Sequence, residues 1–290
     1  MKVSLLTDAP KHNLALMKVS AYHKANGDKV ILNTPLQSGI DLSYGSWLFS
    51  QQYSTDFVGG PAIDPSKILC PEVESMRPDY DLFQTDYSLG FTWRYCPRKC
   101  EFCVVPKQPK VKHHDSIWSF HDNRFSKICL LNNNTFSDPK WLETFEEIWE
   151  AKLTVHDENG YDLRLLDEQK AETLKKTKFD GRIHFAWDFI EDEATIVRGL
   201  ELVKKFKLRA ACYVLIGFPD YRPIDDTDIY RCQKIWDHGV DIYPMPFNGG
   251  NKQLRQFKRF IRLFAYKNYR TIAEGWQLYD PAKRRGRNHG

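Results

Sequence analysis

Hydrophobic positions along this chain of 290 residues follow two different spacings. Short apolar runs, typical of buried strands, alternate with longer stretches in which apolar residues recur roughly every three or four positions, which is typical of helices. Strands that alternate with helices indicate parallel sheets. The pattern therefore predicts an α/β protein.

Residues 1–80 carry a small version of this alternation. The expected elements are strands at 2–6, 29–32 and 46–49, a helix at 12–24, a tight loop at 58–61 and a linker at 71–78. They predict a small Rossmann-like β-α-β extension at the N-terminus. The segment has no G-x-G-x-x-G sequence, so no dinucleotide site is expected.

Residues 81–250 repeat the β/α unit six times. Strands are expected at 87–94, 127–131, 161–166, 182–187, 209–216 and 240–245. Helices are expected after Asp138 and Asp167, each acting as an N-cap, and at 193–205 and 227–237. Six units predict a partial (β/α)6 barrel that is open, because a closed barrel of this type has eight strands.

Residues 251–290 form the third expected segment, a basic helix at about 252–266 followed by a tail. Leu254, Phe257, Ile261 and Phe264 recur at helical spacing and should be buried. The whole chain has a net charge of +4, but this segment contains eleven Lys and Arg residues against two acids. A basic end is compatible with a polyanionic partner, and equally with a solvated helix face and tail.

Cys96, Cys100 and Cys103 lie in the order C-x3-C-x2-C. Three thiolates at this spacing can hold three irons of a [4Fe–4S] cluster and leave the fourth iron open for chemistry. Zinc is the alternative, with His113 or His114 as the fourth ligand. Disulfides are not expected, because the chain has seven cysteines and no secretory apolar segment, which together indicate a reducing cytosolic compartment.

Active sites of β/α barrels lie at the C-terminal ends of the strands. Asn132, Asn133 and Asn134 follow the second expected strand, and Asp188 and Met245 lie at the ends of the fourth and sixth. The asparagines suit ribose hydroxyls or an amino-acid group, or they simply form a loop. Arg164 lies within the third expected strand and needs either Asp188 or a ligand carboxylate as its partner.

The motif Cys96-x3-Cys100-x2-Cys103, with Phe102 before the last cysteine and an expected strand ahead of it, resembles the radical S-adenosylmethionine (radical SAM) enzymes. The resemblance implies a [4Fe–4S] cluster on the three cysteines and S-adenosylmethionine bound at the fourth iron. It implies reductive cleavage of S-adenosylmethionine and hydrogen abstraction from a substrate, with electrons from a donor such as flavodoxin or ferredoxin. Phe102, Asn132, Asn134, Arg164, Asp188 and Met245 are the expected cofactor-binding residues.

The N-terminal segment also resembles a shortened cobalamin-binding domain, but it lacks the D-x-H-x-x-G motif, so cobalamin is not expected. The Gly-Gly-Glu run of many radical SAM enzymes is absent as well, and Asn132 to Asn134 take its place. Cys129, Cys212 and Cys232 are interpreted as small buried residues, with a catalytic thiol as the alternative. The sequence identifies neither the substrate nor a catalytic residue, and a nucleotide or nucleic acid is compatible with the basic stretches.

No apolar run is long enough to span a membrane. The competing hypothesis is a binding protein without catalysis, which holds zinc or a cluster and uses its basic C-terminus to bind nucleic acid.

Overall fold

The computed structural model describes residues 1–35, 37–157, 159–220, 222–249, 251–264 and 269–281. The chain packs as two compact units, Met1–Asn159 and Gly160–Gly290. The strands in both units pair in parallel, which confirms the predicted α/β class. The predicted segment boundaries near residues 80 and 250 fall inside these units and stay a prediction. Within the described part of the chain, no helix has the length and apolar character needed to cross a membrane.

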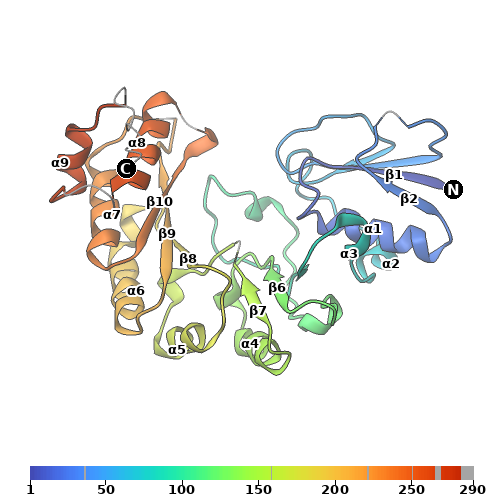
Figure 1. Cartoon of the computed structure of the whole chain (residues 1–290), viewed down its shortest axis with the longest axis horizontal. Helices are drawn as coiled ribbons and strands as arrows, with labels where there is room; N and C mark the ends of the chain where they lie inside the picture. The colour runs from blue at the N-terminus through green and yellow to red at the C-terminus, as the bar shows by residue number, and fades with distance from the viewer. Residues whose placement is uncertain (36, 158, 221, 250, 265–268, 282–290) are drawn as a thin grey trace, which may run out of the picture. The chain divides into compact units, whose positions relative to one another are not determined.

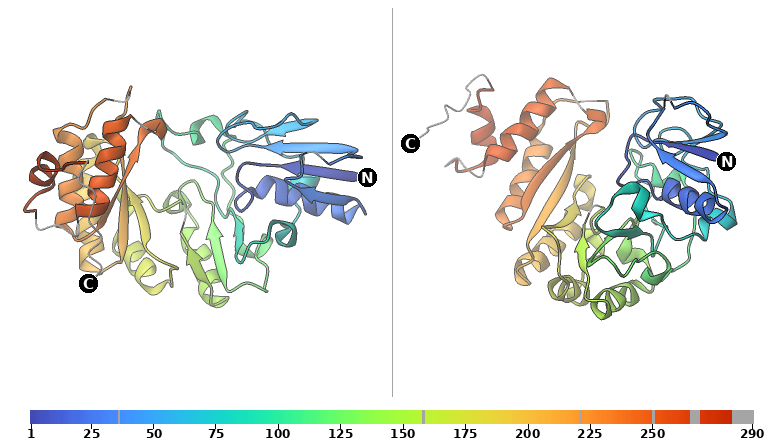
Figure 2. Two further views of the ribbon diagram at one scale, coloured as in Figure 1. Left: turned by 45° about the horizontal axis from the view of Figure 1, so that its top comes forward. Right: turned by 45° about the vertical axis from the view of Figure 1, so that its right-hand side comes forward.

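Unit 1 begins with a four-stranded parallel sheet. Its strands are β1 (Lys2–Leu6), β2 (Lys29–Leu32), β3 (Leu42–Ser46) and β4 (Phe57–Gly59), in the order β2-β1-β3-β4. Helix α1 (Leu14–Ala25) connects β1 to β2 and lies against one face of the sheet (Figure 2). Asn13 caps α1 by accepting a hydrogen bond from the Leu16 amide. The predicted strands at 2–6 and 29–32 are confirmed.

The third strand of this sheet lies at 42–46 rather than at the predicted 46–49, and β4 occupies part of the predicted loop at 58–61. The carboxylate of Asp8 explains where β3 ends. It accepts hydrogen bonds from the backbone amides of Leu48, Phe49 and Ser50, at 2.8 to 3.0 Å. These amides therefore bind a side chain instead of a neighbouring strand, and the chain leaves the sheet.

The short helix α2 (Pro71–Glu74) lies within the predicted linker at 71–78, and a second short helix, α3 (Tyr80–Phe83), follows it. Val73 in α2 and Tyr80 in α3 are buried in the same hydrophobic core as Leu5 of β1 and Leu89 of the next sheet. The segment is therefore part of the packed core of unit 1, because burying Val73 and Tyr80 removes their apolar surface from water.

The second sheet of unit 1 has the order β5-β6-β7. Its elements are β5 (Ser88–Gly90), β6 (Lys127–Leu130), α4 (Trp141–Glu150) and β7 (Thr154–His156), with short 3₁₀ helices η1 (Val105–Lys107), η2 (Ile117–Ser119) and η3 (Thr135–Ser137). Strand β7 was not predicted, since it is only three residues long and two of them are polar. Helix α4 begins at Trp141 and not directly after Asp138.

Gly90 ends β5, and no side chain fits at this position. A Cβ atom placed there would lie 2.3 Å from Cγ of Phe120, whose backbone carbonyl is held by Tyr80 Oη at 2.7 Å. The Gly90→Ala substitution should therefore lower the free energy of unfolding by about 1–3 kcal/mol, the usual cost of overpacking. Urea denaturation checks this value. Gly59→Ala is the matched control, because its Cβ would meet only the flexible Lys67 side chain at 3.6 Å. Equal effects of the two substitutions would contradict the steric argument.

Unit 2 contains a three-stranded parallel sheet in the order β10-β9-β8. Its elements are η4 (Leu163–Leu165), α5 (Glu168–Lys176), β8 (Ile183–Ala186), η5 (Ile190–Asp192), α6 (Glu193–Lys205), β9 (Ala210–Ile216), α7 (Asp226–Asp237), β10 (Asp241–Pro246), η6 (Phe247–Gly249), α8 (Lys252–Phe264) and α9 (Ile272–Gln277). Helices α6, α7 and α8 lie on one side of this sheet (Figure 1). The opposite face carries His184, Tyr213 and Tyr243, which are partly exposed.

The predicted strand at 161–166 is wrong. Only Tyr161 forms a β-bridge, to Phe185, and the chain then turns into η4. Asp162 causes this turn, because its side chain accepts a hydrogen bond from the Arg164 amide and caps η4. The six strands β5 to β10 thus form two three-stranded sheets, one in each unit. A partial barrel that joins all six strands stays a prediction.

Helix α8 agrees with its predicted amphipathic pattern. Leu254, Phe257, Ile261 and Phe264 are buried, and Lys252, Arg255, Arg259 and Arg262 are exposed. Residues 265–266 of the predicted helix lie outside the described residues, as do the basic tail residues Lys283, Arg284, Arg285 and Arg287.

Candidate functional site

The three cysteines of the C-x3-C-x2-C motif lie in a loop that follows β5. Trp93 and His114 form an antiparallel β-bridge at the base of this loop, so residues 94–113 close on themselves. We call this segment the cysteine loop. Cys96, Cys100 and Cys103 are all partly exposed within it, and the Cys103 amide donates to the Cys100 carbonyl at 3.0 Å in a turn.

Asn132 holds the base of the cysteine loop. Its Oδ1 accepts hydrogen bonds from the amides of Thr92 at 2.8 Å and Trp93 at 3.0 Å. Its Nδ2 donates to the hydroxyl groups of Thr92 and Thr135. Both the oxygen and the nitrogen of this amide are therefore engaged, and a ligand would have to replace one of these bonds.

Asn133 and Asn134 contact the loop itself. Nδ2 of Asn133 donates to the backbone carbonyl of Arg94 at 2.6 Å and to Oε1 of Gln108 at 3.2 Å, so it connects the two ends of the loop. Nδ2 of Asn134 lies 3.8 Å from Sγ of Cys96, within hydrogen-bond range for sulfur. The sequence placed the asparagines correctly at the end of β6 but did not show that they fasten the cysteine loop.

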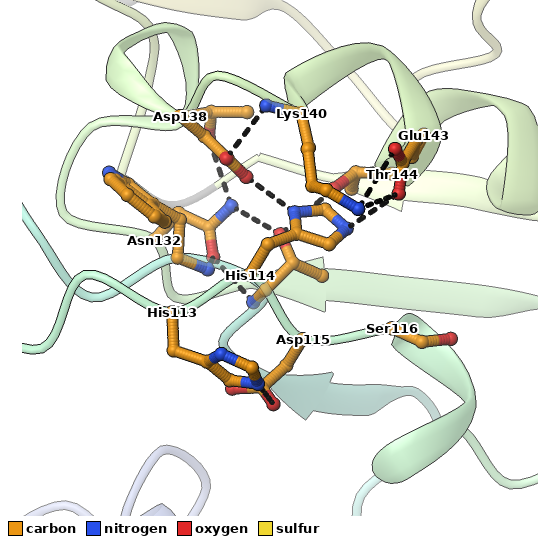
Figure 3. A network of polar contacts seen from close by, with 12 residues as sticks. His113, His114, Asp115, Ser116, Asn132, Asp138, Lys140, Glu143 and Thr144 are labelled. Atoms are coloured by element: carbon orange, nitrogen blue, oxygen red, sulfur yellow. Dashed lines mark hydrogen bonds and ion pairs between the residues drawn. The ribbon is translucent and has the colours of Figure 1, made fainter.

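The two adjacent histidines point in different directions (Figure 3). Nδ1 of His114 lies 2.6 Å from Oδ2 of the buried Asp138, and its Nε2 lies 3.7 Å from Oε2 of Glu143. The His113 side chain is 75% exposed and lies near Asp115. Asp138 thus binds His114 and the Lys140 amide instead of capping a helix directly after it, which corrects the sequence prediction. One ring nitrogen of His114 is therefore not available to a metal.

Within the residues that the structure describes, no group of three or more His, Cys, Asp or Glu side chains is arranged to hold a metal ion. The three thiols are thus not gathered into a preformed set of ligands. The chemistry of the donors nevertheless fits an iron–sulfur cluster, which takes thiolate ligands and hydrogen bonds to sulfur. Besides Asn134 at Cys96, the Val105 amide donates to Sγ of Cys103 at 3.4 Å.

Arg164 does not pair directly with Asp188, which corrects the predicted partner. Its Nε lies 2.7 Å from Oδ1 of Asp162, and its Nη1 lies 2.7 Å from Oδ2 of Asp192. Burial lowers the pKa of the Arg164 guanidinium, but the two carboxylates outweigh it and raise the pKa above its ordinary value. Arg164 is therefore a charged residue within a local ion-pair group.

Asp188 and Met245 lie on either side of Leu215 at the C-terminal end of the sheet in unit 2. The Leu215 backbone acts on the Asp188 carboxyl and lowers its pKa, and Met245 is the register partner of Leu215 in β10. Burial raises the pKa of Asp188 to about 6, although the charges of Arg231 and Arg164 oppose it. Met245 is 42% exposed. Both residues are thus neighbours of Leu215, and their joint role at one site stays a prediction.

A raised pKa of Asp188 makes the folded protein less stable as the pH rises. The ordinary value is 3.8, so the cost begins near that pH and is complete above about 6. Asp188→Asn removes this titration. The difference in free energy of unfolding between the variant and the parent protein should therefore increase, in favour of the variant, by about 2 kcal/mol when the pH is raised from about 4.5 to about 7.5. Urea denaturation at both pH values measures the gain, and a difference that does not change with pH would disprove the titration.

A buried ion-pair network below Asp188 was not predicted. The Arg231 guanidinium donates to the backbone carbonyls of Trp187 at 2.9 Å and Leu215 at 2.8 Å, and it pairs with Asp228 at 2.6 Å. Asp228 also pairs with Arg222 at 2.8 Å. The network ties the ends of β8 and β9 to α7. The only sequence signal is the helical spacing of Asp225, Asp228 and Arg231, which places them on one face of α7.

Three further cysteines lie in buried strands and helices. Cys129, Cys212 and Cys232 are fully buried. Burial raises the pKa of the Cys232 thiol to about 12 and that of Cys212 well above its ordinary value. Since the thiolate is the nucleophilic form, neither thiol is suited to catalysis at neutral pH.

No model of a known protein family matches this chain. No curated protein matches it either. Among solved structures, the chain is similar to Streptococcus suis SuiB, in a crystal structure described as SuiB bound to the precursor peptide SuiA. The sequences are 13% identical and the TM-score is 0.41, over 66% of this chain and 51% of SuiB. The chain thus spans about half the length of that protein. Similarity at this level identifies no activity, so any functional conclusion rests on the residues of the chain itself.

Proposed function

We propose that this protein is a radical SAM enzyme that binds a [4Fe–4S] cluster through Cys96, Cys100 and Cys103. The observation that supports this function is the motif itself, placed in a loop whose base and ends are fastened by Asn132 and Asn133. Because this loop is fastened at its base and ends, only its interior must rearrange to gather the three thiols around a cluster, which lowers the entropic cost of binding.

When bound, the cluster would supply the electron for reductive cleavage of S-adenosylmethionine, which leads to hydrogen abstraction from the substrate. The protein would orient the reactants and exclude water. Phe102, Asn132, Asn134, Arg164, Asp188 and Met245 stay the proposed contacts of S-adenosylmethionine. For Arg164 and Asn132, such a contact would replace one of the hydrogen bonds described above. A carboxyl group with a pKa of about 6, as in Asp188, can hold or release a proton near neutral pH.

The finer features of the fold belong to this proposal: the partial (β/α)6 barrel, the segments 1–80, 81–250 and 251–290, and an electron donor such as flavodoxin or ferredoxin. A nucleotide or nucleic-acid substrate and a cytosolic location also stay predictions. None of them is needed for the test that follows.

The test is anaerobic reconstitution of the full chain with iron and sulfide. The proposal predicts a brown protein with about four irons per chain. Incubation with S-adenosylmethionine and dithionite should release 5′-deoxyadenosine, which mass spectrometry detects. A colourless protein that binds one zinc ion and forms no 5′-deoxyadenosine would contradict the proposal and favour the binding-protein hypothesis.

A further inference from the structure

The sulfurs of Cys96 and Cys103 each accept a hydrogen bond from nitrogen, and the two donors differ in kind. The Val105 amide, 3.4 Å from Sγ of Cys103, is part of the backbone and is present whatever the side chain. The donor to Cys96 is the side-chain amide of Asn134, with Nδ2 at 3.8 Å from Sγ. A change of side chain can therefore remove the Asn134 donor, whereas it leaves the Val105 backbone amide in place.

The backbone of Asn134 is held in place from several directions. The residue is only 5% exposed and directly precedes η3. Its backbone carbonyl accepts hydrogen bonds from the Ser137 amide at 3.1 Å and the Ser137 hydroxyl at 2.9 Å. Ser137 in turn accepts a hydrogen bond from Nε1 of Trp93 at 3.0 Å. Asn134 is therefore attached through its backbone to the base of the cysteine loop, and its buried side chain extends from this fixed point toward Cys96.

We propose that Asn134 is a positioning residue that raises the reduction potential of the cluster by donating a hydrogen bond to the Cys96 sulfur. This inference rests on the proposed function. The reduced cluster carries one more negative charge than the oxidised cluster, so an N–H donor at a ligand sulfur stabilises the reduced form more. In a buried position the effect is stronger, because water screens it less.

Asn133 provides a matched control. It has the same side chain, is the next residue along the chain, and also contacts the cysteine loop, but its amide donates to the Arg94 carbonyl and to Gln108. Asn133→Ala should therefore loosen the loop and lower the amount of bound cluster without changing the hydrogen bond to Cys96. Asn134→Leu removes that donor while keeping a side chain of similar size.

The experiment is a redox titration of the reconstituted full chain, monitored by EPR, with iron and sulfide content measured in parallel. Asn134→Leu should shift the equilibrium away from the reduced cluster about tenfold, equal to a potential about 59 mV more negative for a one-electron couple. Asn133→Ala should leave the potential unchanged. Asn134→Asp has the shape of asparagine and adds a negative charge, so its shift should exceed that of Asn134→Leu.

Three outcomes would overturn the inference. One is an unchanged potential in Asn134→Leu, and another is an equal shift in Asn133→Ala. The third is loss of the cluster from both Asn134 variants while Asn133→Ala retains it, which would assign Asn134 a purely structural role. If the unmodified protein binds a cluster in each of these cases, the proposed function stands. If the unmodified protein binds none, the proposed function fails and the inference fails with it.

Discussion

Cys100→Ala is expected to abolish retention of the iron–sulfur cluster. Cys100 is the central thiol of the motif, and its loss leaves only Cys96 and Cys103 as ligands. Changing even a residue that orients a metal ligand lowers affinity by about 10–100-fold, so removal of a ligand should lower it by more than about 100-fold. Iron and sulfide analysis after anaerobic desalting measures this loss.

Two variants serve as controls. His113→Ala should retain the cluster, because this side chain is largely exposed and lies near Asp115 instead of the thiols. Cys70→Ala should retain it as well, since Cys70 is exposed and precedes α2, far from the motif in sequence. If His113→Ala empties the metal site while Cys100→Ala does not, the ligand assignment is wrong.

Arg231→Met should have the largest effect on stability. The guanidinium is 2% exposed and its partner Asp228 is fully buried. Removing Arg231 leaves the carbonyls of Trp187 and Leu215 without their donor and reduces the charge compensation of Asp228. Loss of one partner of a buried ion pair costs about 3–5 kcal/mol, so the free energy of unfolding should fall by that amount. Urea denaturation with a constant m-value would establish the loss.

Arg198→Met is the matched control for this substitution. Arg198 lies in α6 of the same unit, is exposed, and makes one hydrogen bond to the Arg164 carbonyl. Its replacement should change the free energy of unfolding by no more than about 0.5 kcal/mol. A comparable loss in both variants would mean that the buried network contributes nothing specific.

The elements predicted best are those whose own residues determine their burial. The apolar run at 2–6 and the helical stripe of α8 both appear in the structure as expected. Helix α6 spans 193–205 as predicted, because its apolar residues recur at helical spacing along one buried face.

The errors have a common physical origin, which is a polar side chain that binds the backbone of a distant or neighbouring segment. The Asp8 carboxylate accepts hydrogen bonds from the amides of Leu48 to Ser50, and β3 therefore ends earlier than predicted. Asp162 caps a turn within a segment whose pattern indicated a strand. A hydrophobic pattern contains no information on which backbone amide a carboxylate will bind, so these boundaries could not be predicted.

The sequence predicted where the candidate residues lie along the strands, but not which partners they bind. Sequence placed Asn132, Asp188 and Met245 at the ends of strands, and the structure agrees. The partners of Arg164 and His114 were missed because a sequence with several acids offers many pairings at similar distances along the chain. Asp192 lies 28 residues from Arg164 along the chain, and Asp138 lies 24 residues from His114.

The Asp8 carboxylate also has a consequence for ligands of the N-terminal sheet. In the order β2-β1-β3-β4 the strand order reverses between β1 and β3, and sheets of this kind commonly bind a nucleotide in the crevice at that point. Here the backbone amides of residues 48–50 occupy that crevice and donate hydrogen bonds to the Asp8 carboxylate. A phosphate in this crevice would be repelled by the Asp8 carboxylate and would find the amides of residues 48–50 already bonded, so this crevice does not suit an anion.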